Sequence, residues 1–144
     1  MKYLLAVVLN LGLLAAPLTA SATGGVWCYA KDANMTFDFK AVSSRDGTGG
    51  WFNIEGRLET LFGNLPPALA SFDIKDENLT QRWWDGHEVR LEIQKYQDEP
   101  YGRVRLTLVT KSPGEELYRG DYVLDIDMNG VYSEKKGSMT CDSD

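Results

Sequence analysis

A short segment near the middle of the chain, positions 81–87, combines two adjacent tryptophans with a cation, an acid and the single histidine. The side chains that could contact a ligand here are Arg82, Trp83, Trp84, Asp85 and His87. Neighbouring residues of an extended chain point to opposite sides, so one indole is expected in the core and the other at the surface. An exposed indole beside charged groups could anchor a protein partner or stack on a sugar. The alternative is that both rings serve only to close one end of the core.

Catalytic and cofactor motifs are not recognisable in the sequence. The single histidine, His87, cannot hold zinc without help from cysteines or carboxylates, and no serine lies in a Gly-x-Ser-x-Gly elbow. The glycine-rich stretch 46–50 lacks the Lys-Ser or Lys-Thr of a phosphate loop. Two of the 21 acidic residues could form the carboxylate pair of a glycoside hydrolase, although no pair is singled out. We therefore expect a protein that is not an enzyme and needs no cofactor, with a hydrolase as the remaining alternative.

One segment resembles the beginning of a calcium-binding loop. In the sequence DIDMNG at 125–130, oxygen ligands could come from Asp125, Asp127 and Asn129. The twelfth loop position, where a bidentate acid is expected, is Lys136. The Asn-Gly dipeptide is also the preferred centre of a type I′ hairpin turn, and that hairpin would set Asp125 opposite Glu134. A cation would relieve this like-charge pair, so calcium is kept as an alternative, whereas no metal is favoured.

Alternating apolar and polar residues predict antiparallel strands along most of the chain. Phe37 and Phe39, for example, would face the core while Asp38 and Lys40 face solvent. About eight strands are expected, in the ranges 26–30, 34–42, 52–58, 68–75, 87–96, 101–110, 122–128 and 131–141. Residues 76–86 receive no assignment.

Matching of charges and of apolar side chains predicts the register of three hairpins. In the first, the pairs are Lys40 with Glu55, Asp38 with Arg57, Phe39 with Gly56 and Val42 near Asn53. In the second, which turns at 97–100, they are Tyr96 with Tyr101, Ile93 with Val104, Leu91 with Leu106 and Glu92 with Arg105. In the third, which turns at 129–130, they are Met128 with Val131, Ile126 with Ser133 and Tyr122 with Gly137. The third register also puts Lys135 on the inner side opposite Leu124, a misfit that indicates a bulge or a position at the edge of the core.

The two cysteines of the chain, Cys28 and Cys141, lie near the start of the first predicted strand and the end of the last. Two cysteines and no others are expected to form a disulfide when a protein reaches an oxidising compartment. The predicted fold is therefore all-β: one antiparallel β-sandwich or closed meander barrel, with its N- and C-terminal strands joined by this disulfide. Cα atoms more than about 7 Å apart would contradict that arrangement.

The first 22 residues have the three parts of a secretory signal: a basic start at Lys2, an apolar run that is too short to span a membrane, and a small-residue cleavage site ending at Ala22. We expect residues 1–22 to be removed and residues 23–144 to form one β domain, located in the periplasm or secreted and not inserted in a membrane. The net charge of −6 argues against a nucleic-acid partner.

These observations favour an exported binding module that contacts a protein partner. A carbohydrate-binding or small-ligand-binding module is the alternative. The chain is similar to the periplasmic inhibitors of lysozymes in size, expected location and acidic charge, which would suit an inhibitor-like role. The motifs typical of those inhibitors are not present in the sequence.

Overall fold

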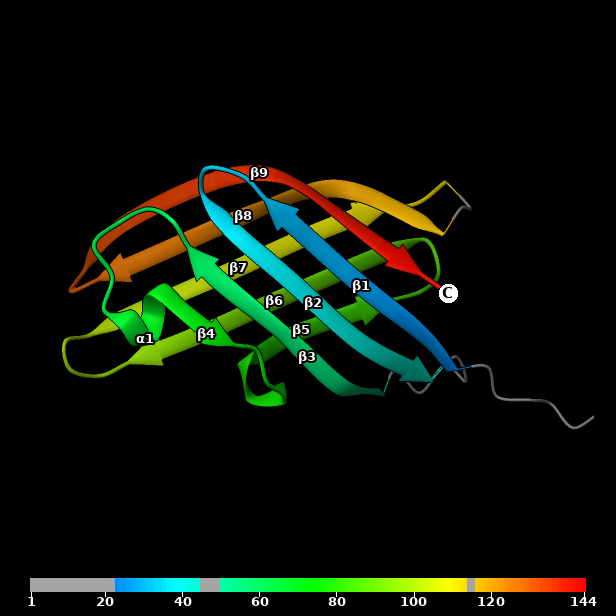
Figure 1. The fold of residues 1–144 in the computed structure, drawn as a ribbon, viewed down its shortest axis with the longest axis horizontal. Coiled ribbons are helices and arrows are strands. Elements are labelled where there is room, and N and C mark those ends of the chain that lie inside the picture. Colours follow the sequence, from blue (N-terminus) through cyan, green and yellow to red (C-terminus); the bar gives the residue numbers. More distant parts are fainter. Residues whose placement is uncertain (1–22, 45–49, 114–115) are drawn as a thin grey trace, which may run out of the picture.

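The computed structural model describes residues 23–44, 50–113 and 116–144, and these form one antiparallel sheet with two short helical turns (Figure 1). The strands are β1 (Thr23–Lys31), β2 (Met35–Ser44), β3 (Trp51–Thr60), β4 (Ser71–Asp73), β5 (Leu79–Trp84), β6 (Glu88–Gln97), β7 (Gly102–Lys111), β8 (Leu117–Met128) and β9 (Val131–Ser143). The helical turns are α1 (Pro67–Ala70) and the 3-10 turn η1 (Asp76–Asn78). The all-β prediction is confirmed, and the predicted signal segment lies outside the described residues. In the described part, no helix is long and apolar enough to cross a membrane.

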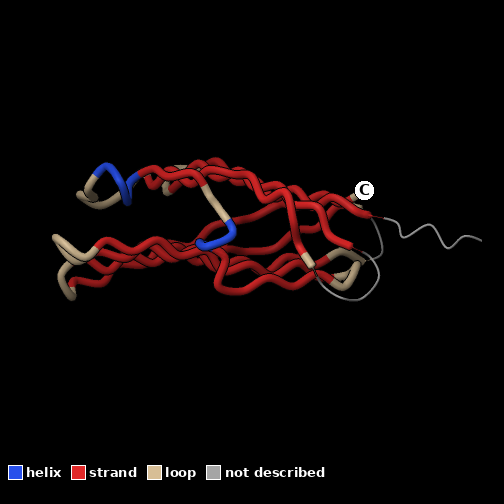
Figure 2. The backbone as a smooth tube through the Cα atoms, turned by 90° about the horizontal axis from the view of Figure 1, so that it is seen from below, coloured by secondary structure: helices blue, strands red, loops and turns tan. Residues whose placement is uncertain are grey.

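The nine strands lie in the order β4-β3-β2-β1-β9-β8-β7-β6-β5. Strands that follow one another along the chain are therefore neighbours, except that β4 and β5 form the two ends of the sheet while β1 pairs with β9. The sheet curls so that β1, β2 and β3 cross in front of β5, β6 and β7, and it forms two layers when seen from below (Figures 1 and 2). The structure is a curled meander whose seam is open between β4 and β5.

The predicted disulfide joins the first strand to the last. Cys28 and Cys141 are directly opposite each other in the β1–β9 pair, with their Cα atoms 4.0 Å apart and their sulfur atoms bonded. Both side chains are buried in the core. The disulfide thus reinforces the strand pair that holds the two halves of the sheet together.

The core lies between the two layers, because alternate residues of every long strand point inward. The largest fully buried side chains are Met35, Phe37, Leu58, Leu69, Leu91, Ile93, Leu106, Leu108, Tyr118, Tyr122, Leu124 and Met139. Burial of each apolar side chain of this size stabilises the fold by roughly 1.5–3 kcal/mol. Apart from Leu69, which belongs to α1, these residues come from both halves of the sheet, so neither half can bury its inner face alone.

The first and third hairpins have the predicted registers. Lys40 lies opposite Glu55 and Phe39 opposite Gly56. Val42 pairs with Phe52, one residue from the expected position, because the register shifts between Lys40 and Val42. At the third turn, both central residues have positive φ (52° for Asn129 and 80° for Gly130), as a type I′ turn requires.

Lys135 lies opposite Leu124 without a register shift in the β8–β9 pair, so the alternative of a bulge is wrong and the position at the edge of the core is confirmed. Its ammonium group lies 5.7 Å from the centre of the Phe62 ring. The aromatic face accommodates the cation at this edge.

The register predicted for the second hairpin is wrong by two residues. Leu91 pairs with Leu108 and Ile93 with Leu106, while Gln97 lies opposite Gly102. A shift of two residues leaves every side chain on its own face of the sheet, so alternation alone could not distinguish the two registers. Tyr101 is consequently part of the turn instead of the strand.

The strand predicted at 68–75 is only partly present. Residues 67–70 form α1, and β4 covers Ser71–Asp73 alone. Pro67 occupies the first turn of the helix, where a missing N–H costs nothing. Leu69 of this helix is buried and lies against Gly102 of β7, where a Cβ would be 2.5 Å from the Leu69 Cδ1 atom. Helix α1 thus covers one end of the core, a role that strand alternation does not reveal.

Candidate functional site

The two adjacent tryptophans lie on opposite sides of β5, as predicted. Trp84 is half-buried and packs against the core, whereas 54% of Trp83 is exposed on the outer face. Because β5 is the last strand of the sheet, Trp83 lies at its edge. It is the large aromatic residue of segment 81–87 that is available to a partner.

Hydrogen bonds fix the inner tryptophan and the turn that follows it. The indole Nε1 of Trp84 donates to Tyr118 Oη over 3.0 Å, and that hydroxyl donates to the carbonyl of Gly86 over 2.8 Å. Gly86 has a φ of 88°, a conformation that favours glycine. The β5–β6 turn is therefore tied to the fully packed Tyr118 ring, which makes Trp84 a structural residue.

Asp85 and His87 also form hydrogen bonds that stabilise the β5–β6 turn. The Asp85 Oδ1 atom accepts hydrogen bonds from the backbone N–H groups of His87 and Glu88, both over 2.9 Å. The pKa of Asp85 is lowered mainly by the hydrogen bond from the His87 N–H and next by the one from the Glu88 N–H. The carbonyl of His87 accepts the N–H of Ser112 over 2.8 Å. The carboxylate thus binds the backbone of the turn, which explains the sequence pattern without a catalytic pair.

Arg82 lies on the opposite side of β5 from Trp83. It is paired in register with the buried Leu91, and its Nη1 atom lies 2.5 Å from Asp76 Oδ1 in η1. This ion pair spans the connection between the two ends of the sheet. The structure therefore divides the predicted site: Trp83 is on the outer face, and Arg82 is at the open seam.

Charged residues of β6 and β7 lie next to Trp83 on the outer face. Trp83 is opposite Arg90 in the sheet. Arg90 donates to Glu88, and Lys111 lies 3.5 Å from the second oxygen of Glu88. The hydrogen bond from Arg90 is the main cause that lowers the pKa of Glu88. Glu88 therefore stays ionised between two cations, and Arg90, whose guanidinium binds Glu88, is the residue directly opposite Trp83 in the sheet.

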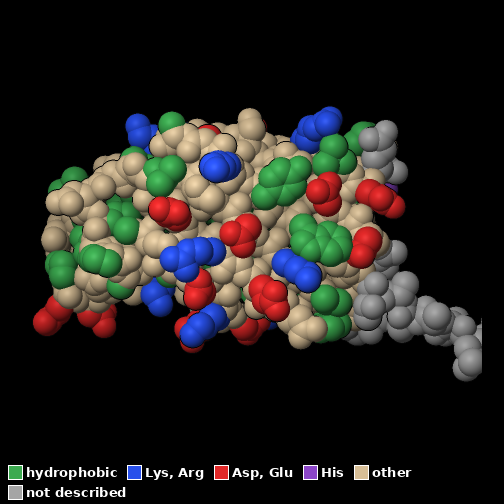
Figure 3. Space-filling model, in the orientation of Figure 1, with side chains coloured by type: hydrophobic (Ala, Val, Ile, Leu, Met, Phe, Trp, Pro, Cys, Tyr) green, Lys and Arg blue, Asp and Glu red, His purple; other side chains and the backbone are tan. Residues whose placement is uncertain are grey.

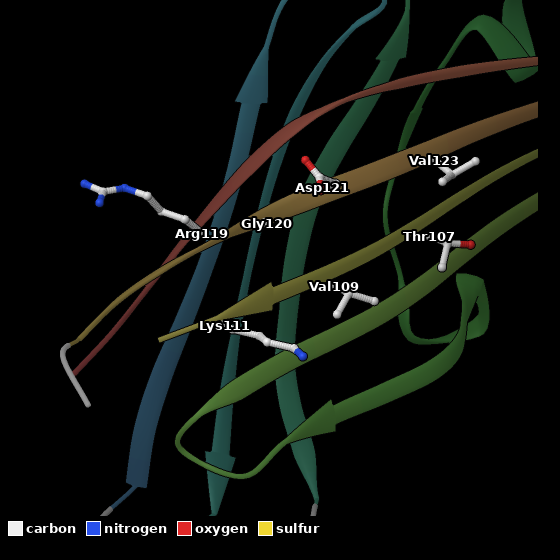
Figure 4. Close-up of a pocket in the computed structure, with 7 residues that line it drawn as sticks. All are labelled: Thr107, Val109, Lys111, Arg119, Gly120, Asp121 and Val123. Atoms are coloured by element: carbon white, nitrogen blue, oxygen red, sulfur yellow. The ribbon is translucent and has the colours of Figure 1, made fainter. Parts of the chain in front are cut away.

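A shallow hollow of about 390 Å³ continues this surface across β7 and β8. It is lined by Thr107, Val109, Lys111, Arg119, Gly120, Asp121 and Val123. Register pairing places Trp83, Arg90, Val109 and Asp121 in one row across four strands. Figure 4 shows that Arg119 and Lys111 extend in different directions, so the two cations do not converge on one anion. The hollow is a partly apolar surface with charged groups at its rim.

Sequence reasoning did not place Arg90 and Val109 beside Trp83. Alternation of apolar and polar residues assigns Arg90 and Val109 to the outer face. The register predicted for the β6–β7 hairpin, however, separates these two residues by two positions. In the structure they are directly opposite each other. The register with Gln97 opposite Gly102 would have been needed to predict this part of the surface.

The calcium candidates lie in a network of protein groups. The carboxylate of Asp125 is buried, and its Oδ2 accepts a hydrogen bond from Arg105 Nε over 2.8 Å and lies 2.6 Å from Nη2 of the same guanidinium. Tyr132 donates to Asp125 and also lies 2.9 Å from Glu134, while Lys136 lies 3.1 Å from Glu134.

The second calcium candidate, Asp127, accepts the N–H of Gly130 over 3.0 Å and so supports the hairpin turn. Among the described residues, no three His, Cys, Asp or Glu side chains gather where they could hold a metal ion. The network around Asp125 relieves the like-charge pair with protein cations and a hydroxyl.

A second aromatic surface lies on the outer face of β1, β2 and β3. Tyr29 and Phe52 are 50% and 43% exposed, and Trp27 is half-buried beside them on the same face. Figure 3 shows apolar side chains on this face among acidic and basic groups. A Cβ at Gly25 would lie 2.5 and 2.9 Å from two carbon atoms of the Trp27 ring. The indole therefore lies against the bare backbone of Gly25.

Comparison with known proteins gave no match: no family model, curated protein or solved structure corresponds to this chain.

Proposed function

We propose that the protein is an exported, non-catalytic module that binds a protein partner on the outer face of β5, β6 and β7, around Trp83. The observation that carries this proposal is the 54% exposure of Trp83, next to an inner tryptophan and a turn that are held by hydrogen bonds. Tryptophan and arginine are enriched among residues that dominate binding energy. A rigid support for Trp83 lowers the ordering cost of association.

Export is supported by the disulfide, since such bonds persist in oxidising compartments. The periplasm is the proposed location because the residues that flank the apolar run of the signal-like segment 1–22 are more typical of bacterial than of eukaryotic signals. An inhibitor-like role is one form of this proposal, in which the bound partner is an enzyme.

Affinity capture from extracts of the source organism tests the proposal. The disulfide-bonded protein is immobilised as wild type, as Trp83→Ala and as Tyr29→Ala, the last being a matched loss of an exposed aromatic residue from the other half of the sheet. The proposal expects a stoichiometric protein partner that the wild type and Tyr29→Ala retain and that Trp83→Ala binds at least about tenfold more weakly. Equal retention by all three proteins would refute the role of Trp83.

A second candidate function, carbohydrate binding, is favoured by the position of Trp27. The Trp27 ring contacts the backbone of Gly25 and is half-buried on the outer face, where a sugar ring can stack on its accessible part, and Tyr29 lies two residues along the same face. Titration with oligosaccharides, followed by tryptophan fluorescence, tests this candidate. It requires a response that Trp27→Ala removes and Trp83→Ala retains.

A further inference from the structure

The curled sheet has two ends, and their exposed strands differ. At one end, β4 is three residues long. The part of β3 that β4 leaves unpaired contains the register shift opposite Lys40 and Val42 and includes Asn53, whose φ is 51°. Short edge strands and local irregularities are devices by which proteins prevent pairing with other chains. This end of the sheet is therefore poorly suited to accept another strand.

The other end is the six-residue strand β5, and it carries fewer such devices. A register shift affects its beginning, between Leu79 and Gln81, whereas Gln81–Trp84 pairs regularly with β6. The strand contains no proline, glycine, lysine or acidic residue. Its one charge, Arg82, is paired with Asp76. In the described part of the chain, no strand lies beside the outer edge of β5.

The hydrogen-bond pattern shows which backbone groups face this edge. The N–H of Asp85 donates to the carbonyl of Glu88 over 3.4 Å, so this pair is of the hydrogen-bonded kind. Hydrogen-bonded and non-hydrogen-bonded pairs alternate in an antiparallel ladder. Trp83 therefore directs its N–H and C=O toward β6, and Arg82 directs its N–H and C=O toward the open edge. A donor and an acceptor are thus presented in the middle of β5, next to the exposed indole.

We propose that an extended segment of the protein partner adds to β5 as a further antiparallel strand. This inference rests on the proposed function, because it specifies how a partner would engage the surface around Trp83. Strand addition of this kind supplies affinity through backbone hydrogen bonds and specificity through alternate side chains. The occupant is a polypeptide because the groups that await partners are backbone groups.

The side chains of β5 define the pattern of the added segment. A residue beside Trp83 on the outer face is apolar, since it packs on the indole. A residue beside Arg82 on the inner face is acidic, because Asp76 engages Nη1 and leaves Nε and Nη2 to another acceptor. The partner segment therefore alternates apolar and acidic residues. A second copy of this chain fits less well, since antiparallel pairing of two β5 strands centred on Arg82 sets like charges opposite each other.

Two synthetic peptides test the inference on the full disulfide-bonded protein. The first is a fluorescently labelled octapeptide that alternates Val or Tyr with Glu. The second is the same peptide with N-methyl groups on the glutamates, whose N–H groups face β5 in antiparallel pairing. Binding is measured by fluorescence anisotropy. The first peptide is expected to bind and the methylated one is not, whereas equal binding of both, or binding of neither, overturns the inference.

Two variants of one residue separate backbone pairing from side-chain contact. Arg82→Ala removes the guanidinium and keeps the N–H, whereas Arg82→Pro removes both without taking a donor from the β5–β6 ladder. Arg82→Pro is expected to bind the first peptide about tenfold more weakly than Arg82→Ala. Equal affinities of the two variants overturn the inference. If capture of the partner still depends on Trp83 in that case, the proposed function stands and only the strand addition is refuted.

Amide hydrogen exchange provides a measurement that does not depend on either variant. In the wild type without peptide, the Arg82 amide is expected to exchange rapidly and the Trp83 amide slowly, because only the latter donates to β6. Bound peptide is expected to slow exchange at Arg82. No change at Arg82 when peptide is bound overturns the inference. Size-exclusion chromatography with light scattering, in which a dimer forms as protein concentration rises, would assign the edge to a second copy and also overturn it.

Discussion

The hydroxyl of Tyr122, in the middle of β8, donates to Asp32 Oδ2 in the turn between β1 and β2 over 2.5 Å. The other carboxylate oxygen of Asp32 accepts the backbone N–H groups of Asn34 and Met35. Gly137 leaves room for this contact, since a Cβ there would lie 2.6 Å from the same Asp32 oxygen. One buried tyrosine thereby anchors the first turn of the chain to the far strands of the sheet.

Tyr122→Phe is expected to lower the free energy of unfolding by about 1.5–3 kcal/mol, because the part-buried bond to an ionised carboxylate is lost. Tyr29→Phe, on the exposed outer face, is the control and is expected to change it by less than about 0.5 kcal/mol. Urea unfolding followed by tryptophan fluorescence measures both. Equal effects of the two substitutions would contradict the structural role of Tyr122.

The same contact predicts a dependence on alkaline pH. Burial, followed by the bond to Asp32, raises the pKa of Tyr122 from 10.0 to about 12. The folded state therefore favours the protonated hydroxyl, so this stabilisation is complete below pH 10 and is lost as the pH rises toward 12. The difference in unfolding free energy between wild type and Tyr122→Phe should shrink over that range. A constant difference from pH 9 to 12 would refute this explanation.

Loss of the disulfide is expected to destabilise the whole domain. The bridge closes a loop between residues 113 positions apart, and removal of a native disulfide typically costs about 2–5 kcal/mol. The double substitution Cys28→Ser with Cys141→Ser, measured by thermal unfolding, tests this expectation. Wild type treated with a reductant should match the double variant. An unchanged melting temperature would show that the β1–β9 pair does not need the bridge.

Gly120 has no room for a side chain. A Cβ there would overlap the carbonyl oxygen of Val109 and lie 2.8 Å from Thr110 Cα. Gly120→Ala must therefore move backbone in the β7–β8 pair, and it is expected to destabilise the protein by about 1–3 kcal/mol. Gly50→Ala is the control, because its nearest neighbour is 4.0 Å away. Its stability should be unchanged or slightly raised. Similar melting temperatures for both variants would contradict the close approach at Gly120.

The ion pair between Arg105 and Asp125 differs from that between Arg57 and Asp73 in burial. The side chain of Asp125 is 4% exposed, whereas the side chains of Arg57 and Asp73 are 54% and 72% exposed. Arg105→Ala leaves a buried carboxylate without its main partner and is expected to cost about 3–5 kcal/mol. Arg57→Ala should cost less than about 1 kcal/mol. Urea titrations of the two variants test the contrast, which equal losses would contradict.

Calcium should leave the melting temperature of the wild type unchanged, because Arg105 and Tyr132 already engage the carboxylate of Asp125. Differential scanning calorimetry with and without millimolar calcium chloride measures this. The variant Arg105→Ala provides a comparison in which the carboxylate lacks its cation. A rise in the wild-type melting temperature would restore the calcium alternative.

Local rules predicted the hairpin at Asn129 and Gly130 correctly because one turn type fixes its register. Both central residues need positive φ, and this dipeptide meets that need at one position only. The turn before Gly102 has no such marker. Two registers that differ by two residues bury the same side chains there, so the sequence could not choose between them.

Ion pairs to a strand outside the hairpin could not be predicted from the hairpin registers alone. Asp38 is opposite Arg57 as predicted, yet the Arg57 guanidinium binds Asp73 of β4 over 2.7 Å. Arg105 was expected to meet Glu92, and it binds Asp125 of β8. Arg105 lies opposite Gln94 of β6 and Asp125 of β8, so its carboxylate comes from the strand outside the predicted hairpin. Arg57 lies opposite Asp38 on one side and Asp73 on the other, and the ion pair forms with Asp73.

The sequence by itself determined the all-β fold class and the inward and outward faces of the long strands, because alternation of apolar and polar residues is a local property. It also determined the closure of the chain by Cys28 and Cys141, because two cysteines allow only one pairing. It also determined that one of two adjacent tryptophans must be exposed. Only the tertiary structure decided that Trp83 is the exposed one and that β5 is an end of the sheet. The physical reason is that exposure and edge position depend on which strands are neighbours, and pairing between strands distant in the chain is set by the packing of the whole core.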